Sequence, residues 1–132
     1  MKIKIKIEAE LDLESLFVTA IEGGSNYWCS FEEDSIITIR AVMPKSEEPC
    51  FSVACMRAVV EKGVKVPVYD AEDDSLEPIG YLDYSLFEER LGKMAEDEHM
   101  RKHLLDMVNE EYDANTADVI FQYLILNDVV YG

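Results

Sequence analysis

The residues best suited to chemistry gather in one short segment, which reads Glu22, Gly23, Gly24, Ser25, Asn26, Tyr27 and Trp28. A double glycine lets a backbone approach a ligand closely, and its exposed N–H groups, together with Asn26, could bind an anion or a base edge. Tyr27 and Trp28 could stack on a ring or on a partner's side chain. The candidate ligand-binding or partner-binding residues are therefore Glu22, Gly23, Gly24, Asn26, Tyr27 and Trp28.

The same segment also has a purely structural interpretation. It follows a predicted helix, so one glycine could take the left-handed conformation that ends a helix, and the aromatic residues would then begin the core. The segment has no lysine and no GxxxxGK[ST] pattern, and it lies at the wrong end of the helix for the dipole to attract an anion. The structural interpretation is favoured, and a recognition surface is the alternative.

Two further patterns suggest a metal ion but lack essential residues. His99 and His103 lie one helical turn apart, yet the chain has only these two histidines and no glutamate follows His99. Residues 70–74 begin like a calcium loop, but Ser75 stands where glycine is needed and Tyr81 where glutamate is needed. We expect no metal site and no cofactor.

Nothing in the sequence supports a catalytic assignment. The three cysteines, Cys29, Cys50 and Cys55, form no CxxC pair and no repeated spacing, so we expect free thiols buried as small hydrophobic residues in a reducing compartment. There is no GxSxG pattern, and carboxylates are too abundant for any one pair to indicate an acid and a base. The interpretation leans towards a protein that is not an enzyme.

The charge of the chain is strongly negative and unevenly distributed. The sequence has 28 acidic and 12 basic side chains, for a net charge of −16. Residues 67–132 hold 17 acidic and 4 basic side chains, so this half carries most of the imbalance. Such a field repels nucleic-acid phosphates and attracts basic surfaces. We therefore expect no direct binding to nucleic acid, and a protein partner with a basic surface.

The elements that must position these residues follow from periodicity. Alternation predicts a strand over residues 2–8, with a strand or extended loop over 25–31, a buried strand over 35–43 and an edge strand with Pro67 over 64–69. Apolar spacing predicts helices over residues 13–22, 51–62, 85–95, 99–112 and 117–126. The remaining expectations are an acidic loop over 70–78, an extended tail over 129–132, and helix N-caps at Asp12, Asp83 and either Asn115 or Thr116.

This order predicts one α+β domain over residues 1–132: a small antiparallel or mixed sheet with about four to five helices, packed on it in a single layer. The alternation of lysine and isoleucine at the start does not fit a secretory signal. No apolar stretch reaches the ~18 residues of a membrane span. We expect a cytoplasmic protein that is not in a membrane, and the sequence leaves its oligomeric state open.

Several segments also carry a resemblance. Residues 20–28 resemble the ALEGGSNYW motif of a family of small uncharacterised proteins from bacteriophages and gut bacterial genomes. Residues 68–72, 113–119 and 129–132 resemble the middle and the C-terminal end of that family, with Asn127 in place of a family-like glycine. The resemblance implies a mobile-element context and a bacterial cytoplasm, and it brings no activity or catalytic residue with it.

Two functions therefore stand side by side. The first is a non-enzymatic interaction protein, for instance a phage-derived inhibitory or accessory protein whose acidic C-terminal half occupies a basic groove. The second is a small-ligand or nucleotide-binding domain, a class that includes enzymes, in which the segment from Glu22 to Trp28 forms a pocket wall. The first is slightly preferred because of the charge asymmetry.

Overall fold

Helices make up most of the chain in the computed structural model, which describes residues 1–3, 8–44, 49–73 and 76–132. The described elements are α1 (Leu13–Thr19), the π-helical turn η1 (Ala20–Gly24), β1 (Cys29–Ser30), α2 (Glu33–Arg40), α3 (Phe51–Val60), β2 (Val66–Asp70), β3 (Gly80–Leu82), the 3-10 turn η2 (Tyr84–Leu86), α4 (Phe87–Glu96), α5 (Arg101–Val108) and α6 (Ala114–Leu126). In this part of the chain, six α-helices accompany a three-stranded antiparallel sheet, which confirms the α+β class. The strand expected over 2–8 falls largely on residues outside the described ranges.

The sheet has the order β1-β2-β3, so β2 lies in the middle and the edge position expected for it is wrong. Its proline is tolerated because β1 pairs only with Tyr69 and Asp70, at the far end of β2. On the side of β2 that faces away from β3, Pro67 has no partner strand among the described residues. Helix α2 lies there instead, and the Ser35 hydroxyl donates to the Pro67 carbonyl at 2.7 Å. The proline therefore occupies a local edge, where no ladder N–H is needed.

The strand predicted over residues 35–43 is wrong, because most of this segment is helix α2. The β-branched residues favour a strand by propensity. Burial nevertheless follows a helical spacing: Ser35 and Ile39 are buried, whereas Ile36 and Ile37 are exposed. The Asp34 side chain accepts from the Ser35 N–H at 2.8 Å near the start of the helix. Tertiary packing of one face decides the structure here, and two isoleucines stay at the surface.

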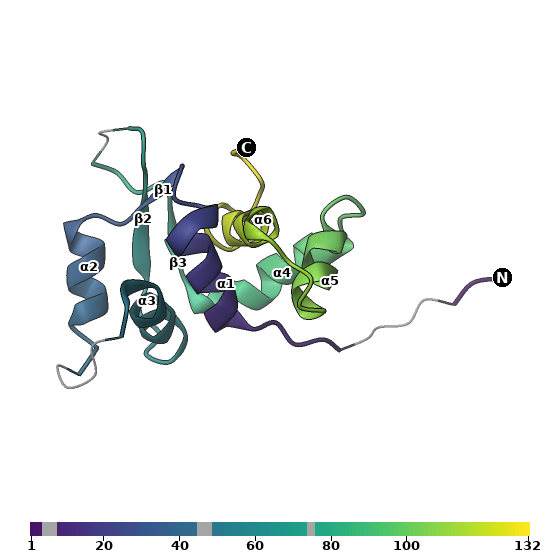
Figure 1. The fold of residues 1–132 in the computed structure, drawn as a ribbon, viewed down its shortest axis with the longest axis horizontal. Coiled ribbons are helices and arrows are strands. Elements are labelled where there is room, and N and C mark those ends of the chain that lie inside the picture. The colour runs from purple at the N-terminus through teal and green to yellow at the C-terminus, as the bar shows by residue number, and fades with distance from the viewer. Residues whose placement is uncertain (4–7, 45–48, 74–75) are drawn as a thin grey trace.

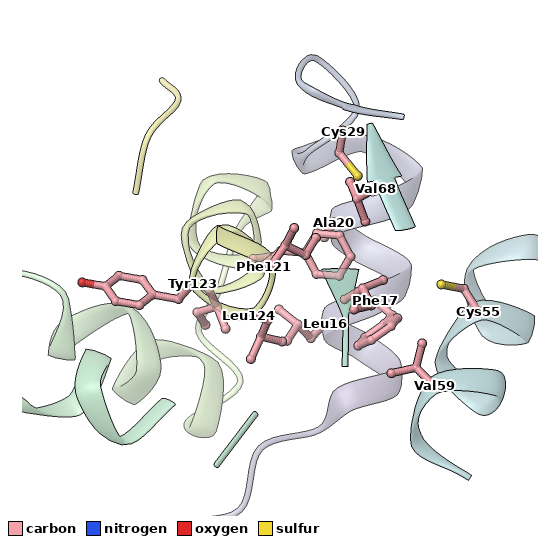
Figure 2. Packing of buried hydrophobic residues seen from close by; sticks show 14 of the residues in the cluster. Leu16, Phe17, Ala20, Cys29, Cys55, Val59, Val68, Phe121, Tyr123 and Leu124 are labelled. Carbon is pink, nitrogen blue, oxygen red and sulfur yellow. The ribbon is translucent and has the colours of Figure 1, made fainter. Parts of the chain in front are cut away.

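The central element is α6, as its apolar sequence predicts. Every residue from Thr116 to Ile125 is buried. Figure 2 shows Phe17 of α1 between Phe121 of α6 on one side and Val59 of α3 on the other. The rings of Phe17 and Phe121 meet edge to face, with their centroids 5.3 Å apart, a favourable arrangement for two aromatic rings.

The remaining elements lie on either side of this core. In Figure 1, α2 lies beside β2 at one end of the molecule, and α4 and α5 lie together at the other, with α1 and α6 between them. Among the described residues, no helix combines the length and the hydropathy that crossing a bilayer requires.

Two of the three predicted helix caps are confirmed. The carboxylates of Asp12 and Asp83 accept from backbone N–H groups at the start of α1 and η2, which confirms both caps. The cap of α6 is Asp113, not Asn115 or Thr116, and its carboxylate accepts from the Thr116 N–H at 2.9 Å. Each cap satisfies a donor that has no partner within its own helix.

Candidate functional site

A buried carboxylate organises one end of the core. Asp118 of α6 is only 4% exposed, and its oxygens accept four side-chain hydrogen bonds from described residues. Oδ1 accepts from Ser25 Oγ at 2.8 Å and from Trp28 Nε1 at 2.7 Å. Oδ2 accepts from the Tyr27 hydroxyl at 2.6 Å and from Gln122 Nε2 at 3.2 Å. We call these five residues the Asp118 cluster; all four donors are neutral, and together they replace the water that the carboxylate loses on burial.

The turn after α1 brings three of these donors to α6. The π-helical turn ends where the Ser25 N–H donates to the Ala20 oxygen at 2.8 Å. Neither Gly23 nor Gly24 has a positive φ, so the left-handed helix end expected here is wrong. Gly24 matters for a different reason: a Cβ there would lie 2.5 Å from the Ala114 oxygen, whereas Gly23 has open space. The missing side chain lets the turn pack directly on the start of α6.

Gln122 fastens the C-terminal residues to the same cluster. Its Oε1 accepts from the backbone N–H groups of Val130 at 2.8 Å and Tyr131 at 2.9 Å, and its Nε2 donates to the Tyr131 oxygen at 3.2 Å. The Tyr131 ring stacks on Trp28 with centroids 5.1 Å apart and planes 9° apart. The Tyr131 hydroxyl donates to Asp70 Oδ2 at 3.2 Å. Segments far apart in the sequence thus meet around one carboxylate.

The other candidate residues from the sequence lie apart from this cluster. Glu22 is exposed, and its carboxylate accepts from the Ser52 hydroxyl of α3 at 3.1 Å. Asn26 is also exposed, and its side chain makes no hydrogen bond to any described residue. The structure therefore brings Tyr27 and Trp28 together on Asp118, while Glu22 is directed to α3 and Asn26 to solvent.

The cluster perturbs the titration of its neighbours. Burial, followed by the hydrogen bond to Asp118, raises the pKa of Tyr27 to about 12, so this hydroxyl stays protonated and donates at neutral pH. Burial, followed by the Asp118 charge, raises the pKa of the Cys29 thiol to about 12, and burial raises the pKa of the Cys55 thiol as well. These two thiols are poor nucleophiles at neutral pH.

The three cysteines are free, and Cys29 and Cys55 are buried as expected. Cys50 is exposed just before α3, so the expectation of burial is wrong for this residue. No three or more His, Cys, Asp and Glu side chains within the described ranges are grouped closely enough to hold a metal ion.

A small hollow opens beside the cluster. It has a volume of about 170 Å³ and is lined by Tyr27, Trp28, Asp70, Glu72, Asp73 and Tyr131. We call it the aromatic–acidic pocket. Tyr27 is 44% exposed, whereas Trp28 is 1% exposed and lies beneath Tyr131. The candidate segment thus contributes one core residue and one surface residue, and neither interpretation of the sequence describes both.

A larger depression adjoins this pocket and shares Asp70 and Asp73 with it. It has a volume of about 710 Å³ and is lined by Glu32, Glu33, Asp34, Ile37, Tyr69, Asp70, Ala71, Asp73 and Leu76. We call it the acidic groove. The described residues of its lining include five carboxylates and no basic side chain, and two of its apolar side chains, Ile37 and Leu76, are 60% and 93% exposed.

Sequence reasoning missed Asp118, Gln122 and the acidic residues of α2 as parts of a site. One signal was available: Asp118 and Gln122 stand four residues apart on a helix that is otherwise apolar, so both side chains needed polar partners inside the protein. The segment 32–34 precedes residues predicted as a strand, which hid its place at the start of helix α2.

A comparison of the chain with models of known families gives no match, and comparisons with curated proteins and with solved structures give no significant match either.

Proposed function

We propose that this chain is a non-enzymatic interaction protein whose acidic groove binds a partner with a basic surface. The observation that carries the proposal is the combination of five carboxylates with the exposed apolar side chains of Ile37 and Leu76 in one concave surface. Carboxylates raise the rate at which a basic partner associates and make the binding selective. Apolar residues supply contact area that charged residues alone do not. An acidic groove of this kind suits a cytoplasmic inhibitory or accessory protein that occupies a nucleic-acid-binding surface.

The groove refines the expectation from the sequence. The charge asymmetry placed the binding surface in the C-terminal half of the chain. The groove instead combines Asp70 and Asp73 with Glu32, Glu33 and Asp34 from the less acidic half. Folding therefore adds carboxylates from the weakly charged N-terminal half of the chain to those of the strongly acidic C-terminal half.

Two basic side chains are engaged away from the acidic groove. Arg90 donates to the carbonyl oxygens of Leu124 and Ile125 at 2.7 and 3.1 Å, and Lys93 donates to the Asn127 oxygen at 2.8 Å. These two cations are engaged at the C-terminal end of α6, where they oppose the helix dipole. Neither cation is among the described residues that line the acidic groove.

A charge-reversal pair tests the proposal. Glu33 and Glu88 are both exposed and both lie in the first turn of a helix, α2 and α4, but only Glu33 lines the groove. Glu33→Lys and Glu88→Lys change the net charge and the helix dipole interaction equally. Titration with a fluorescent peptide rich in arginine, lysine and leucine should show binding that Glu33→Lys weakens roughly tenfold, or about 1.4 kcal/mol, with little effect of Glu88→Lys.

Two results would count against the groove. Equal weakening by both variants would mean that the peptide responds only to net charge. No binding to the wild-type protein at low ionic strength, or binding that does not fall as salt is added, would remove the electrostatic basis of the proposal.

A further inference from the structure

We propose that the aromatic–acidic pocket binds one arginine side chain of the partner. The inference rests on the proposed function and adds to it the chemical group that is recognised. The pocket is too small for a nucleotide or a drug-sized ligand, since such sites usually have volumes of about 300–1,000 Å³, whereas this one has about 170 Å³. Its size suits one side chain entering from the surface.

Aromatic rings supply the first half of the recognition. Tyr27 and Tyr131 line the pocket with rings that are already held in place. The Tyr27 hydroxyl is fixed by Asp118 at 2.6 Å, and the Tyr131 ring is fixed by its stacking on Trp28 and by its hydroxyl bond to Asp70. A cation near such ring faces is attracted by the ring quadrupole, and rings that are fixed in advance lose little freedom on binding.

Carboxylates supply the second half. Asp70, Glu72 and Asp73 stand on the same pocket, and the Glu72 N–H donates to Asp70 Oδ1 at 2.9 Å, which shapes the loop around it. Asp70 turns its other oxygen, Oδ2, towards Tyr131. A guanidinium group can interact with the aromatic rings and the carboxylates at the same time, because it is planar, stacks on rings and carries five hydrogen-bond donors. A lysine ammonium would satisfy the charge but not the stacking.

The position of the pocket agrees with a single partner segment. Asp70 and Asp73 line both the pocket and the acidic groove, so the two hollows lie next to each other at the end of β2. An arginine in the pocket would leave the neighbouring residues of its chain over the groove, within reach of the exposed Leu76. The pocket would then set the register of a segment that the groove holds by charge.

Three peptides of otherwise identical basic sequence test this inference, with arginine, lysine or citrulline at one central position. Citrulline keeps the planar shape of arginine without its charge. Trp28 is the single tryptophan of the chain and lies under Tyr131, so its fluorescence reports occupancy. We expect the arginine peptide to bind at least fivefold more tightly than the other two and to change the Trp28 emission.

Variants of the protein locate the effect. Tyr131→Leu should lower the affinity for the arginine peptide at least fivefold, whereas Tyr131→Phe, which keeps the ring, should retain most of it. Glu72→Gln should weaken binding without altering the fold, since Glu72 is an exposed loop residue. Tyr84→Leu is the matched control, because Tyr84 is 47% exposed and lies outside the pocket. Melting temperatures of all variants identify any loss of folding.

The outcomes separate this inference from the proposed function. If the three peptides bind equally, or if Tyr131→Leu and Glu72→Gln bind like the wild type while Glu33→Lys is weakened, the groove stands and the arginine pocket is refuted. If no basic peptide binds the wild-type protein at low salt, both proposals fall.

Discussion

Asp118 keeps its place in the interior because four neutral donors surround its carboxylate. Asp118→Asn preserves the shape but replaces one acceptor oxygen with an NH2 group, which then faces donors instead of accepting from them. Hydrogen bonds to charged groups contribute about 1.5–3 kcal/mol each, and buried donors left unpaired cost about 1–3 kcal/mol. We expect the free energy of unfolding, measured by urea denaturation, to fall by about 2–4 kcal/mol.

Asp128→Asn is the control for this variant, since Asp128 is an exposed aspartate that, among the described residues, accepts only from the neighbouring Val129 N–H at 2.8 Å. Its substitution should change stability by less than about 0.5 kcal/mol. Similar values for the two variants would show that the Asp118 cluster does not stabilise the fold.

Two tyrosines should make the protein sensitive to alkali. Burial raises the pKa of Tyr27 to about 12, and the hydrogen bond to Asp34 at 2.5 Å raises the pKa of Tyr69 to about 12. A raised pKa means that the folded state binds the phenolic proton more tightly than the unfolded state, whose tyrosines titrate near 10. The resulting stability is fully present below pH 10 and is lost as the pH rises towards about 12.

Urea midpoints measured across this alkaline range should therefore decline steeply for the wild-type protein. In the double variant Tyr27→Phe and Tyr69→Phe the decline should be shallower, although the protein starts from a lower stability. Parallel declines in both proteins would assign the alkaline sensitivity to other groups.

At the residue scale, the sequence identified the donors but not their acceptor. Tyr27 and Trp28 stand out by type and by their place after a double glycine, so a local pattern is enough to single them out. Asp118 is more than 80 residues away along the chain, and in one sequence a single aspartate on an apolar helix could have been a solvated residue. Only the packing of the turn on α6 shows which aspartate these donors meet.

At the element scale, the contact between the turn and α6 depends on one glycine. Gly24→Ala would place a Cβ 2.5 Å from the Ala114 oxygen, a backbone atom that cannot move without displacing the start of α6. Overpacking of this kind costs about 1–3 kcal/mol. Thermal and urea unfolding should both show the loss, and the Trp28 emission should shift because the turn that carries Trp28 moves.

Gly23→Ala is an unusually close control. Gly23 precedes Gly24, has no positive φ, and has nothing within 4 Å of an added Cβ. Alanine costs less backbone entropy than glycine in a helical conformation, so stability should stay equal or rise by up to about 1 kcal/mol. A loss as large as that of Gly24→Ala would mean that the turn needs both glycines for their flexibility.

The elements themselves were predictable where one face is buried and caps are present. Asp12 and the apolar spacing after it identify α1, and the polar flanks of an apolar run identify α6. The strand predicted over residues 35–43 was wrong because the prediction followed the strand propensity of β-branched residues. The helical spacing of the buried positions is visible only in the structure, where Ile36 and Ile37 lie at the surface. Propensity decides poorly when tertiary contacts select one face of a short segment.

At the scale of the whole molecule, folding gathers negative charge on particular surfaces. The acidic groove and the aromatic–acidic pocket both lie at the end of β2, where carboxylates from two halves of the chain meet. A second acidic surface, on α4, contains Glu88, Glu89 and Glu96. Some basic side chains bind main-chain oxygens, as with Arg101, whose Nε donates to the Ala95 oxygen at 2.6 Å, whereas Lys65 lies 3.8 Å from Asp83 Oδ2.

This imbalance predicts that salt stabilises the folded protein. With 28 acidic and 12 basic side chains, repulsion between carboxylates is stronger in the compact state than in the expanded unfolded chain. Raising sodium chloride from about 10 mM to about 150 mM shortens the screening length from about 30 Å to about 8 Å. The melting temperature should therefore rise by a few degrees over this range, and Glu96→Gln, which removes a carboxylate from the C-terminal end of α4, should melt higher than the wild type at the low-salt end.

Choline chloride separates screening from binding of sodium at the carboxylates, because it supplies the same ionic strength with a bulky organic cation. Equal stabilisation by the two salts is the result expected from screening. A melting temperature that does not change, or that falls as salt is added, would mean that ion pairs and not repulsion dominate the surface. In that case the carboxylates of the groove would already be compensated within the protein, and a basic partner would gain little from them.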